Sequence, residues 1–183
     1  MQTLIVTLLG SIDAEKIDAD DKVGPDNVAL LAQVATLIKQ HQGSWQASHL
    51  TELAGHIAGL LEIQVPIIHS APLSQALQQL PDLKIQVLTA RGATPMGQAA
   101  HLTVTAIERP GIMAELFEVL APLNVRIKSL HTASYAAPTT DTQVFEANFM
   151  INLPYGQLLH DLLQQLQALG EDLVVSLDLI ATL

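Results

Sequence analysis

The stretch "HLTVTAIERPGIMAELFEVL", residues 101–120, joins two kinds of periodicity across a Pro-Gly pair. In residues 101–107 apolar and polar side chains alternate, which is typical of a β-strand with one buried face. In residues 112–120 apolar side chains recur every four residues, which favours a helix. A strand that passes into a helix at Pro110-Gly111 is therefore the element from which the rest of the chain is interpreted.

Both halves of the chain contain this strand-helix element followed by the same sequence of patterns. In each half the predicted order is strand, helix, strand, strand, helix, strand. The short turn between the two middle strands of the first half is expected at Ala54-Gly55. The predicted ranges are 2–10, 28–41, 44–50, 56–66, 70–80 and 83–90, and then 101–107, 111–123, 125–135, 142–154, 155–170 and 173–180.

This order predicts an α+β protein built from two ferredoxin-like βαββαβ domains in tandem, each an antiparallel sheet with helices on one face. The domains are expected at residues 1–90, with an acidic insertion at 11–25, and at residues 99–183, joined by a linker at 91–98. The other face of each sheet is left uncovered, so the two domains, or two chains, are expected to pack together.

Composition excludes several classes of function. The 183 residues are 49% apolar, contain no cysteine and carry a net charge of −10 with only eight Lys and Arg. Disulfides and thiolate metal sites are thereby excluded, and direct binding of nucleic acid is not expected. No apolar run approaches the roughly 20 residues that span a bilayer. With no recognisable signal peptide, the sequence predicts a cytoplasmic protein without membrane contact.

The junction at Glu108–Ile112 is the candidate ligand-binding site. Its helix begins with backbone N–H groups that have no helical partner, and such a helix end attracts a carboxylate or phosphate. Pro110 is expected at the first helical position, and Gly111 would let a ligand approach the backbone. The alternative is an ordinary strand-to-helix turn, because Pro and Gly are common at helix starts.

The segment "ERPGIMAELFEVLAPLNVRI", residues 108–127, resembles the D-R-P-G-I-x-x-x-L-x-x-x-L-x-x-x-G-x-N-I signature of ACT domains. Residues 41–66 are similar to the G-G-N-W-x-x-S-R-x-x-x-L-A-G-x-F-A-G-I-L-x-V-x-V-P run of tandem-ACT proteins in the glycine cleavage system transcriptional repressor family. The resemblance implies ligand contacts at both strand-helix junctions. The residues that occupy the matching positions are Glu108, Arg109, Pro110, Gly111, Ile112 and Asn124 in the second half, and Asp26, Asn27 and Ala29 in the first.

The two copies depart from the signature in different ways. In the second copy Glu108 replaces Asp and Asn124 replaces Gly, and Asn tolerates the left-handed conformation better than other non-Gly residues. In the first copy Pro and Gly are lost from "DNVA", residues 26–29. The second junction is therefore the stronger candidate for binding.

By this resemblance, the chain is expected to be a non-enzymatic regulatory protein without metal or cofactor. It would bind a small amino acid such as glycine, modulate a DNA-binding regulator, and form a homodimer. The alternatives are a ligand-free adaptor, a regulatory subunit of an amino-acid metabolic enzyme, and an unrecognised hydrolase or transferase. No G-x-S-x-G, G-x-G-x-x-G or P-loop motif favours catalysis.

Three further groups of residues have competing interpretations. The acidic insertion is either a solvated loop or a site for a hard cation, and it is hypothesised to cover the first junction. His49 and His56 are expected to flank the hairpin turn, where they could face each other. Arg126 and Lys128 could pair with a ligand or partner carboxylate, or belong to a solvated strand face.

Helix starts in the first half are predicted from capping residues. Asp26 or Asn27 is expected to cap the first helix of this half, and Ser70 to cap the second.

Overall fold

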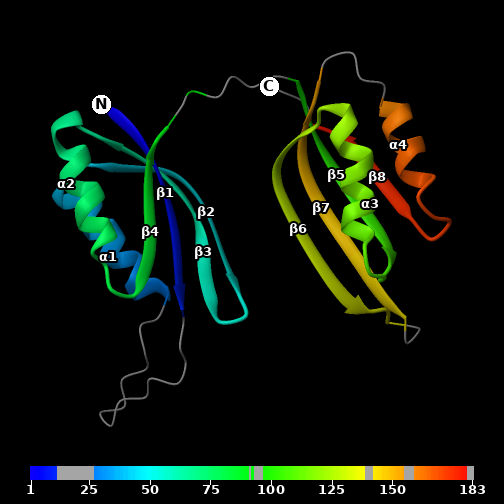
Figure 1. Cartoon of the computed structure of the whole chain (residues 1–183), viewed down its shortest axis with the longest axis horizontal. Coiled ribbons are helices and arrows are strands. Elements are labelled where there is room, and N and C mark those ends of the chain that lie inside the picture. The colour runs from blue at the N-terminus through cyan, green and yellow to red at the C-terminus, as the bar shows by residue number, and fades with distance from the viewer. Residues whose placement is uncertain (12–26, 91, 93–96, 139–141, 155–158, 181–183) are drawn as a thin grey trace, which may run out of the picture. The chain divides into compact units, whose positions relative to one another are not determined.

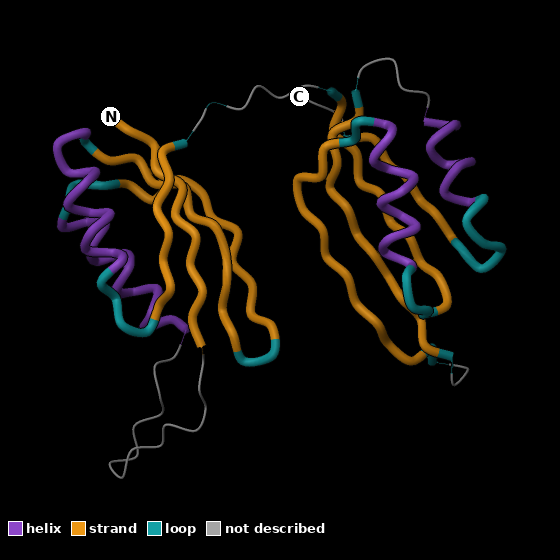
Figure 2. Tube along the Cα trace, viewed as in Figure 1, coloured by secondary structure: helices purple, strands orange, loops and turns teal. Residues whose placement is uncertain are grey.

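The computed structural model describes residues 1–11, 27–90, 92, 97–138, 142–154 and 159–180. The chain divides into two compact units, Met1–Gly92 (unit 1) and Ala93–Leu183 (unit 2). Each unit is a four-stranded antiparallel sheet whose two helices lie on one face (Figures 1 and 2). The prediction of two ferredoxin-like βαββαβ units is confirmed.

Unit 1 has the strand order β2-β3-β1-β4, so β1 and β3 form the centre of the sheet. The hairpin of β2 and β3 turns at Ala54 and Gly55, both with positive φ (49° and 75°), as a two-residue hairpin turn requires. The elements of unit 1 are β1 (Gln2–Ser11), α1 (Asn27–Gln40), β2 (Ser44–Leu53), β3 (His56–Val65), α2 (Ile67–Gln78) and β4 (Leu83–Thr89).

Unit 2 repeats this topology with the strand order β6-β7-β5-β8. A β-bulge occupies the same position in both units, after Trp45 in β2 and after Ile127 in β6. The elements of unit 2 are β5 (Gln98–Ile107), α3 (Ile112–Leu120), a short 3₁₀ turn η1 (Ala121–Leu123), β6 (Arg126–Ala136), β7 (Gln143–Leu153), α4 (Leu159–Gln167) and β8 (Val174–Leu179).

Each core lies between the sheet and its helices, where the two predicted periodicities meet. The helices contribute residues four apart, Leu30, Val34 and Ile38 in α1 and Ile112, Leu116 and Leu120 in α3. The strands contribute every second residue, including Leu4, Val6 and Leu8 in β1 and Leu102, Val104 and Ala106 in β5. Phe149 of β7 is fully buried and contacts Phe117 edge to face, with ring centroids 6.5 Å apart.

The uncovered face of the unit 2 sheet carries a line of hydrogen-bonded polar side chains. The Tyr135 hydroxyl donates to Glu146 Oε2 (3.2 Å), Asn148 Nδ2 donates to Glu146 Oε1 (2.7 Å), and Thr103 Oγ1 donates to Asn148 Oδ1 (2.9 Å). Packing around the phenol, then the hydrogen bond and charge of Glu146, raise the pKa of Tyr135 above its ordinary value of 10.0. These bonds join three strands, because β7 lies between β6 and β5.

Three local predictions are wrong, and a fourth is not tested. The cap of α1 was predicted at Asp26 or Asn27; Asn27 is the first residue of the helix, and Asp26 lies outside the described residues. Pro66, not Ser70, precedes α2; the Ser70 hydroxyl donates to the Ile67 carbonyl instead.

The other two concern facing residues. His49 and His56 do not face each other, since the β2–β3 register pairs His49 with Leu60 and Leu53 with His56. The helical spacing of Leu31, Val34, Ala35 and Ile38 predicts one buried face of α1, but Ala35 is exposed and Leu30 is buried in its place. Strand β5 begins at Gln98, within the segment predicted as linker.

Candidate ligand-binding site

The junction between β5 and α3 is an open turn that ends in glycine. Strand β5 ends at Ile107, and the Glu108 N–H donates to the Gln143 carbonyl (2.9 Å). Helix α3 begins at Ile112, so Pro110 precedes the helix and is not its first residue as predicted. Gly111 sits at the N-cap with φ 92° and ψ −7°, and no side chain caps the helix there.

The left-handed conformation of Gly111 explains why glycine occupies this position, because other residues adopt positive φ at a cost. A methyl group built at Gly111 would have no heavy atom within 4 Å. Pro110 and Gly111 are both exposed. The Ile112 N–H donates to the Arg109 carbonyl (3.5 Å). The N–H groups of Met113 and Ala114 are therefore the donors that the first turn presents to an anion, which the partial positive charge of a helix N-terminus favours.

Arg109 is held by two carboxylates of its own unit. It pairs with Glu115 in the first turn of α3 and with Asp172, whose Oδ2 lies 3.6 Å from Arg109 Nη1. Asp172 Oδ2 also accepts the backbone N–H of Ile107 (3.0 Å). Through Asp172, the ion pair of Arg109 and the hydrogen bond of Ile107 connect the β5–α3 junction to the turn before β8. Arg109 Nη2 is engaged by Glu115, whereas Nη1 is buried and makes no hydrogen bond, so its contact with Asp172 is an ion pair only.

Unlike Arg109, Glu108 has a side chain without a hydrogen-bond or ion-pair partner among the described residues. It is exposed, and no described residue makes a hydrogen bond or ion pair with its carboxylate. An exposed carboxylate three residues before the N-cap glycine can attract an ammonium group. The junction therefore combines donors suited to a carboxylate with an acceptor suited to an amine, and a free amino acid carries both groups.

Asn124, another predicted site residue, is not brought to the junction within unit 2. It follows η1 with φ 51°, and its N–H donates to the Ala121 carbonyl (3.3 Å). The nine residues of α3 and the three of η1 separate it from Gly111, and α3 alone rises about 13 Å along its axis. Gln42 has the corresponding place and conformation in unit 1 (φ 57°), so this position ends the first helix of each unit.

The corresponding junction of unit 1 is built differently. Asn27 Nδ2 donates to Glu52 Oε2 (3.1 Å), which ties the start of α1 to β2. Ala29, in the place of Gly111, is an exposed residue inside the first turn of α1. Asp26 and the acidic insertion lie outside the described residues. The described part of this junction lacks the glycine turn of unit 2.

Sequence reasoning missed Glu115 and Asp172, the two carboxylates that hold Arg109. The internal repeat contained a signal for Asp172, because an Asp-Leu pair lies at the start of the last strand of both units, as Asp82-Leu83 and Asp172-Leu173. Both leucines are buried, so the repeat marks a shared turn. Nothing in the sequence indicated that Arg109 would reach that turn.

Among the described residues, the other features considered as sites lack the neighbouring side chains that a binding site would need. Within the described residues, no three His, Cys, Asp or Glu side chains gather in a way that would hold a metal ion. Arg126 and Lys128 are exposed on β6, and neither forms an ion pair with a described residue. Across the described ranges, no helix has the length and apolar character needed to cross a membrane.

Solved structures share this fold over the whole chain. A protein described as an "Unknown Protein from Galdieria sulphuraria" matches with a TM-score of 0.81 and 20% identity, covering 98% of this chain and 99% of that one. A protein described as a "putative glycine cleavage system transcriptional repressor" matches with a TM-score of 0.64 and 17% identity, covering 99% of this chain and 98% of that one.

Two comparisons gave no match. No protein-family model matches the sequence, and no curated protein matches it. The structural likeness establishes the fold of the two units in tandem.

Proposed function

We propose that the protein is a cytoplasmic, non-enzymatic regulator that binds a small amino acid at the β5–α3 junction of unit 2. Glycine is the first candidate ligand, because a protein of similar fold is described as a "putative glycine cleavage system transcriptional repressor". The regulated partner is a protein that controls transcription. The chain itself, at a net charge of −10, is poorly suited to contact DNA.

The observation that carries the proposal is the uncapped start of α3 beside the free carboxylate of Glu108. The ligand carboxylate would accept hydrogen bonds from the backbone N–H groups of the first helical turn. The ligand ammonium would face Glu108. Arg109, fixed by Glu115 and Asp172, holds the turn in position.

Binding regulates only if the ligand has different affinities for two states of the protein. A ligand seated at the junction would contact whatever surface packs against the exposed Pro110 and Gly111 in the regulatory assembly. The proposed assembly is a homodimer, and the ligand would favour one packing of its units over another. Its effect on that equilibrium is limited to its differential affinity for the two arrangements.

Thermal unfolding in the presence of each common amino acid tests the proposal. A ligand that binds only the folded protein, at a concentration 100 times its dissociation constant, stabilises it by about 2.7 kcal/mol. We expect this stabilisation for glycine or another small amino acid. A flat response to all of them would overturn the sensing function.

A matched pair of variants locates the site. Glu108→Gln removes the carboxylate that faces the ligand amine and should weaken binding. Glu118→Gln makes the same change at an exposed position further along α3 and should leave binding unchanged. Equal effects of the two variants would place the ligand elsewhere.

A ligand-free adaptor is the second candidate, favoured by the loss of the glycine turn in unit 1. It predicts co-purification of a transcriptional regulator without any amino-acid response. Removing residues 11–25 tests the separate hypothesis that the acidic insertion covers the first junction, because amino-acid binding should then increase.

A further inference from the structure

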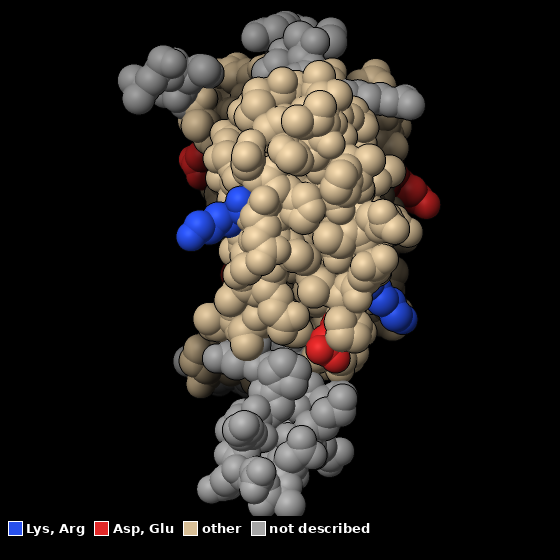
Figure 3. Space-filling view, turned by 90° about the vertical axis from the view of Figure 1, so that its left-hand side faces the viewer, with Lys and Arg blue, Asp and Glu red and all other residues tan. Residues whose placement is uncertain are grey.

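The helix layer of unit 1 is almost free of charge. The 26 residues of α1 and α2 include one charged side chain, Lys39. A helix on the surface of a globular protein ordinarily carries charged residues on its outer face. Figure 3 views the side of unit 1 on which α1 and α2 lie, and its charged side chains appear at the margins of a broad neutral surface.

The outward positions of both helices are small, amide-bearing or apolar. On α1 they include Ala32, Gln33, Thr36 and Gln40, all exposed. On α2, Ile68 is 79% exposed and its neighbour Ile67 is 66% exposed. A partner can bury this surface without the free-energy cost of desolvating charged side chains.

The helices of unit 2 provide an internal comparison. Helix α3 carries Glu115 and Glu118, and α4 carries Asp161, although together they are only 18 residues long. The two units share one fold, so the fold does not require an uncharged helix layer. The difference belongs to the sequence of unit 1.

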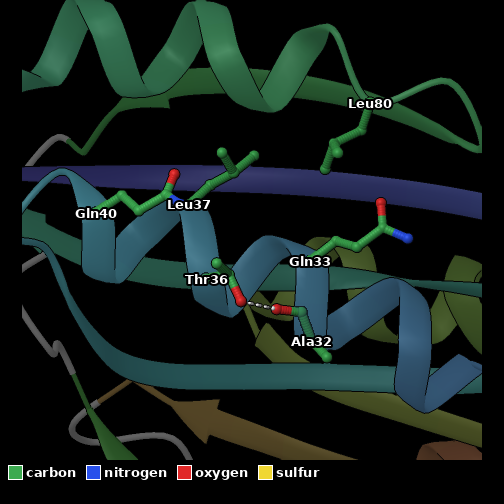
Figure 4. Close-up of a pocket in the computed structure, with 6 residues that line it drawn as sticks. All are labelled: Ala32, Gln33, Thr36, Leu37, Gln40 and Leu80. Atoms are coloured by element: carbon green, nitrogen blue, oxygen red, sulfur yellow. Dashed lines mark hydrogen bonds between the residues drawn. The ribbon is translucent and has the colours of Figure 1, made fainter.

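The neutral layer also contains a groove. A hollow of about 380 Å³ lies between α1 and the chain after α2, lined by Ala32, Gln33, Thr36, Leu37, Gln40 and Leu80. Figure 4 shows Leu37 and Leu80 on opposite sides of this groove, with Gln33 reaching toward Leu80. The Thr36 hydroxyl is occupied by the Ala32 carbonyl (2.8 Å) and offers no free donor. The groove is therefore suited to an apolar side chain.

We propose that the helix layer of unit 1 is the surface through which two copies of this chain associate. The reason is electrostatic. Two copies of a chain of net charge −10 repel each other, and like charges brought together at an interface oppose association. On the helix layer of unit 1 two copies can meet without bringing carboxylates together, because α1 and α2 contain no Asp or Glu.

Other partners fit this surface less well. A cationic protein would find no carboxylate on α1 or α2, and nucleic acid or an anionic membrane would need more cationic side chains than the single Lys39. A two-fold contact requires one self-complementary patch. This layer supplies both an exposed apolar side chain, Ile68, and an apolar groove.

Sedimentation equilibrium of the full chain tests the proposal with a matched set of variants. Gln33→Glu with Gln40→Glu places two carboxylates on the groove, at exposed helical positions that tolerate Glu. Gln164→Glu with Gln165→Glu adds the same charge at exposed positions of α4. Circular dichroism checks that every variant is folded.

The wild type should sediment as a dimer. The α1 variant should weaken dimerisation at least tenfold, with partial recovery at high salt because ions screen the repulsion, whereas the α4 variant should dimerise normally. Ile68→Ala should weaken dimerisation without any dependence on salt. A monomeric wild type, or equal effects of the α1 and α4 variants, would overturn the proposal.

This inference deepens the proposed homodimer, but it does not depend on the ligand. Amino-acid binding is measured by unfolding and dimerisation by mass, so one can fail while the other holds. A dimer that survives the α1 variant would refute this surface alone.

Discussion

Replacing Asp172 with alanine should destabilise unit 2 and leave unit 1 unchanged. Asp172 accepts the Ile107 N–H at 3.0 Å and faces Arg109 Nη1 at 3.6 Å. A hydrogen bond to a charged group contributes about 1.5–3 kcal/mol, and a partly exposed ion pair adds about 0–1 kcal/mol. Because the Asp172 side chain is 30% exposed, we expect a loss of about 2 kcal/mol, from the lower part of this range.

Urea unfolding can assign the loss to one unit, because the only tryptophan, Trp45, lies in unit 1. Far-ultraviolet circular dichroism reports both units. For a unit of this size the slope is about 1 kcal/mol per molar urea, so the unit 2 transition should fall by about 2 M. The tryptophan transition should remain in place if the units unfold independently.

Two control variants sharpen the result. Asp172→Asn keeps an oxygen acceptor for the Ile107 N–H and loses the charge, so it should cost about 0.5–1 kcal/mol. Glu171→Ala changes an exposed neighbour and should cost less than about 0.5 kcal/mol. If Asp172→Ala proves no more costly than Glu171→Ala, the proposed link between Arg109, Asp172 and the junction is wrong.

Three further predictions follow from single contacts. Gly59→Ala should disrupt the β2–β3 pairing and lower the thermal unfolding temperature, because its methyl group would overlap the His49 carbonyl oxygen. Gly92→Ala is the control: its methyl group meets no atom within 4 Å, so the unfolding temperature should not change. Phe149→Ala should cost unit 2 about 3–5 kcal/mol in urea unfolding, and a loss under about 1 kcal/mol would contradict its burial. Tyr135 should titrate above its ordinary pKa of 10.0, and its contribution to stability should persist below that pH and disappear as pH rises through the folded pKa. Glu146→Gln should lower this pKa in a tyrosinate absorbance titration, and an unchanged titration would refute the Tyr135–Glu146 bond.

The fold was predictable because local patterns and global topology agree. The alternation through Leu102, Val104 and Ala106 and the four-residue spacing from Ile112 to Leu120 each specify one buried face. The order strand-helix-strand-strand-helix-strand is that of the split βαβ arrangement, and its recurrence in both halves supported the prediction. The hairpin turn at Ala54-Gly55 was predictable for the same reason, since its short loop has few solutions.

The errors arose where a side chain can form more than one local hydrogen bond, or where the strand register determines which residues face each other. Ser70 is compatible with a cap, but the helix begins earlier, after Pro66, so the hydroxyl bonds inside the first turn. His49 and His56 flank a turn, yet antiparallel pairing places His49 opposite Leu60. Register depends on the turn position to a single residue.

The site was only partly accessible from sequence. The passage from strand to helix near Pro110-Gly111 was expected, but the helix begins at Ile112, so Pro110 and Gly111 form a turn before it, and the left-handed conformation of Gly111 explains its glycine. The engagement of Arg109 by Asp172 was not, because it joins residues 63 positions apart through a side chain. Contacts of that kind depend on tertiary packing, which periodicity does not encode.

The most direct test of the account is an amide NMR titration of the full chain with glycine. If the start of α3 binds the ligand carboxylate, the N–H signals of Gly111, Ile112 and Met113 should shift in a saturable manner. The matching signals of unit 1, at Ala29 and Leu30, should not move. Saturating glycine and other small amino acids that leave the α3 signals in place would contradict the central claim.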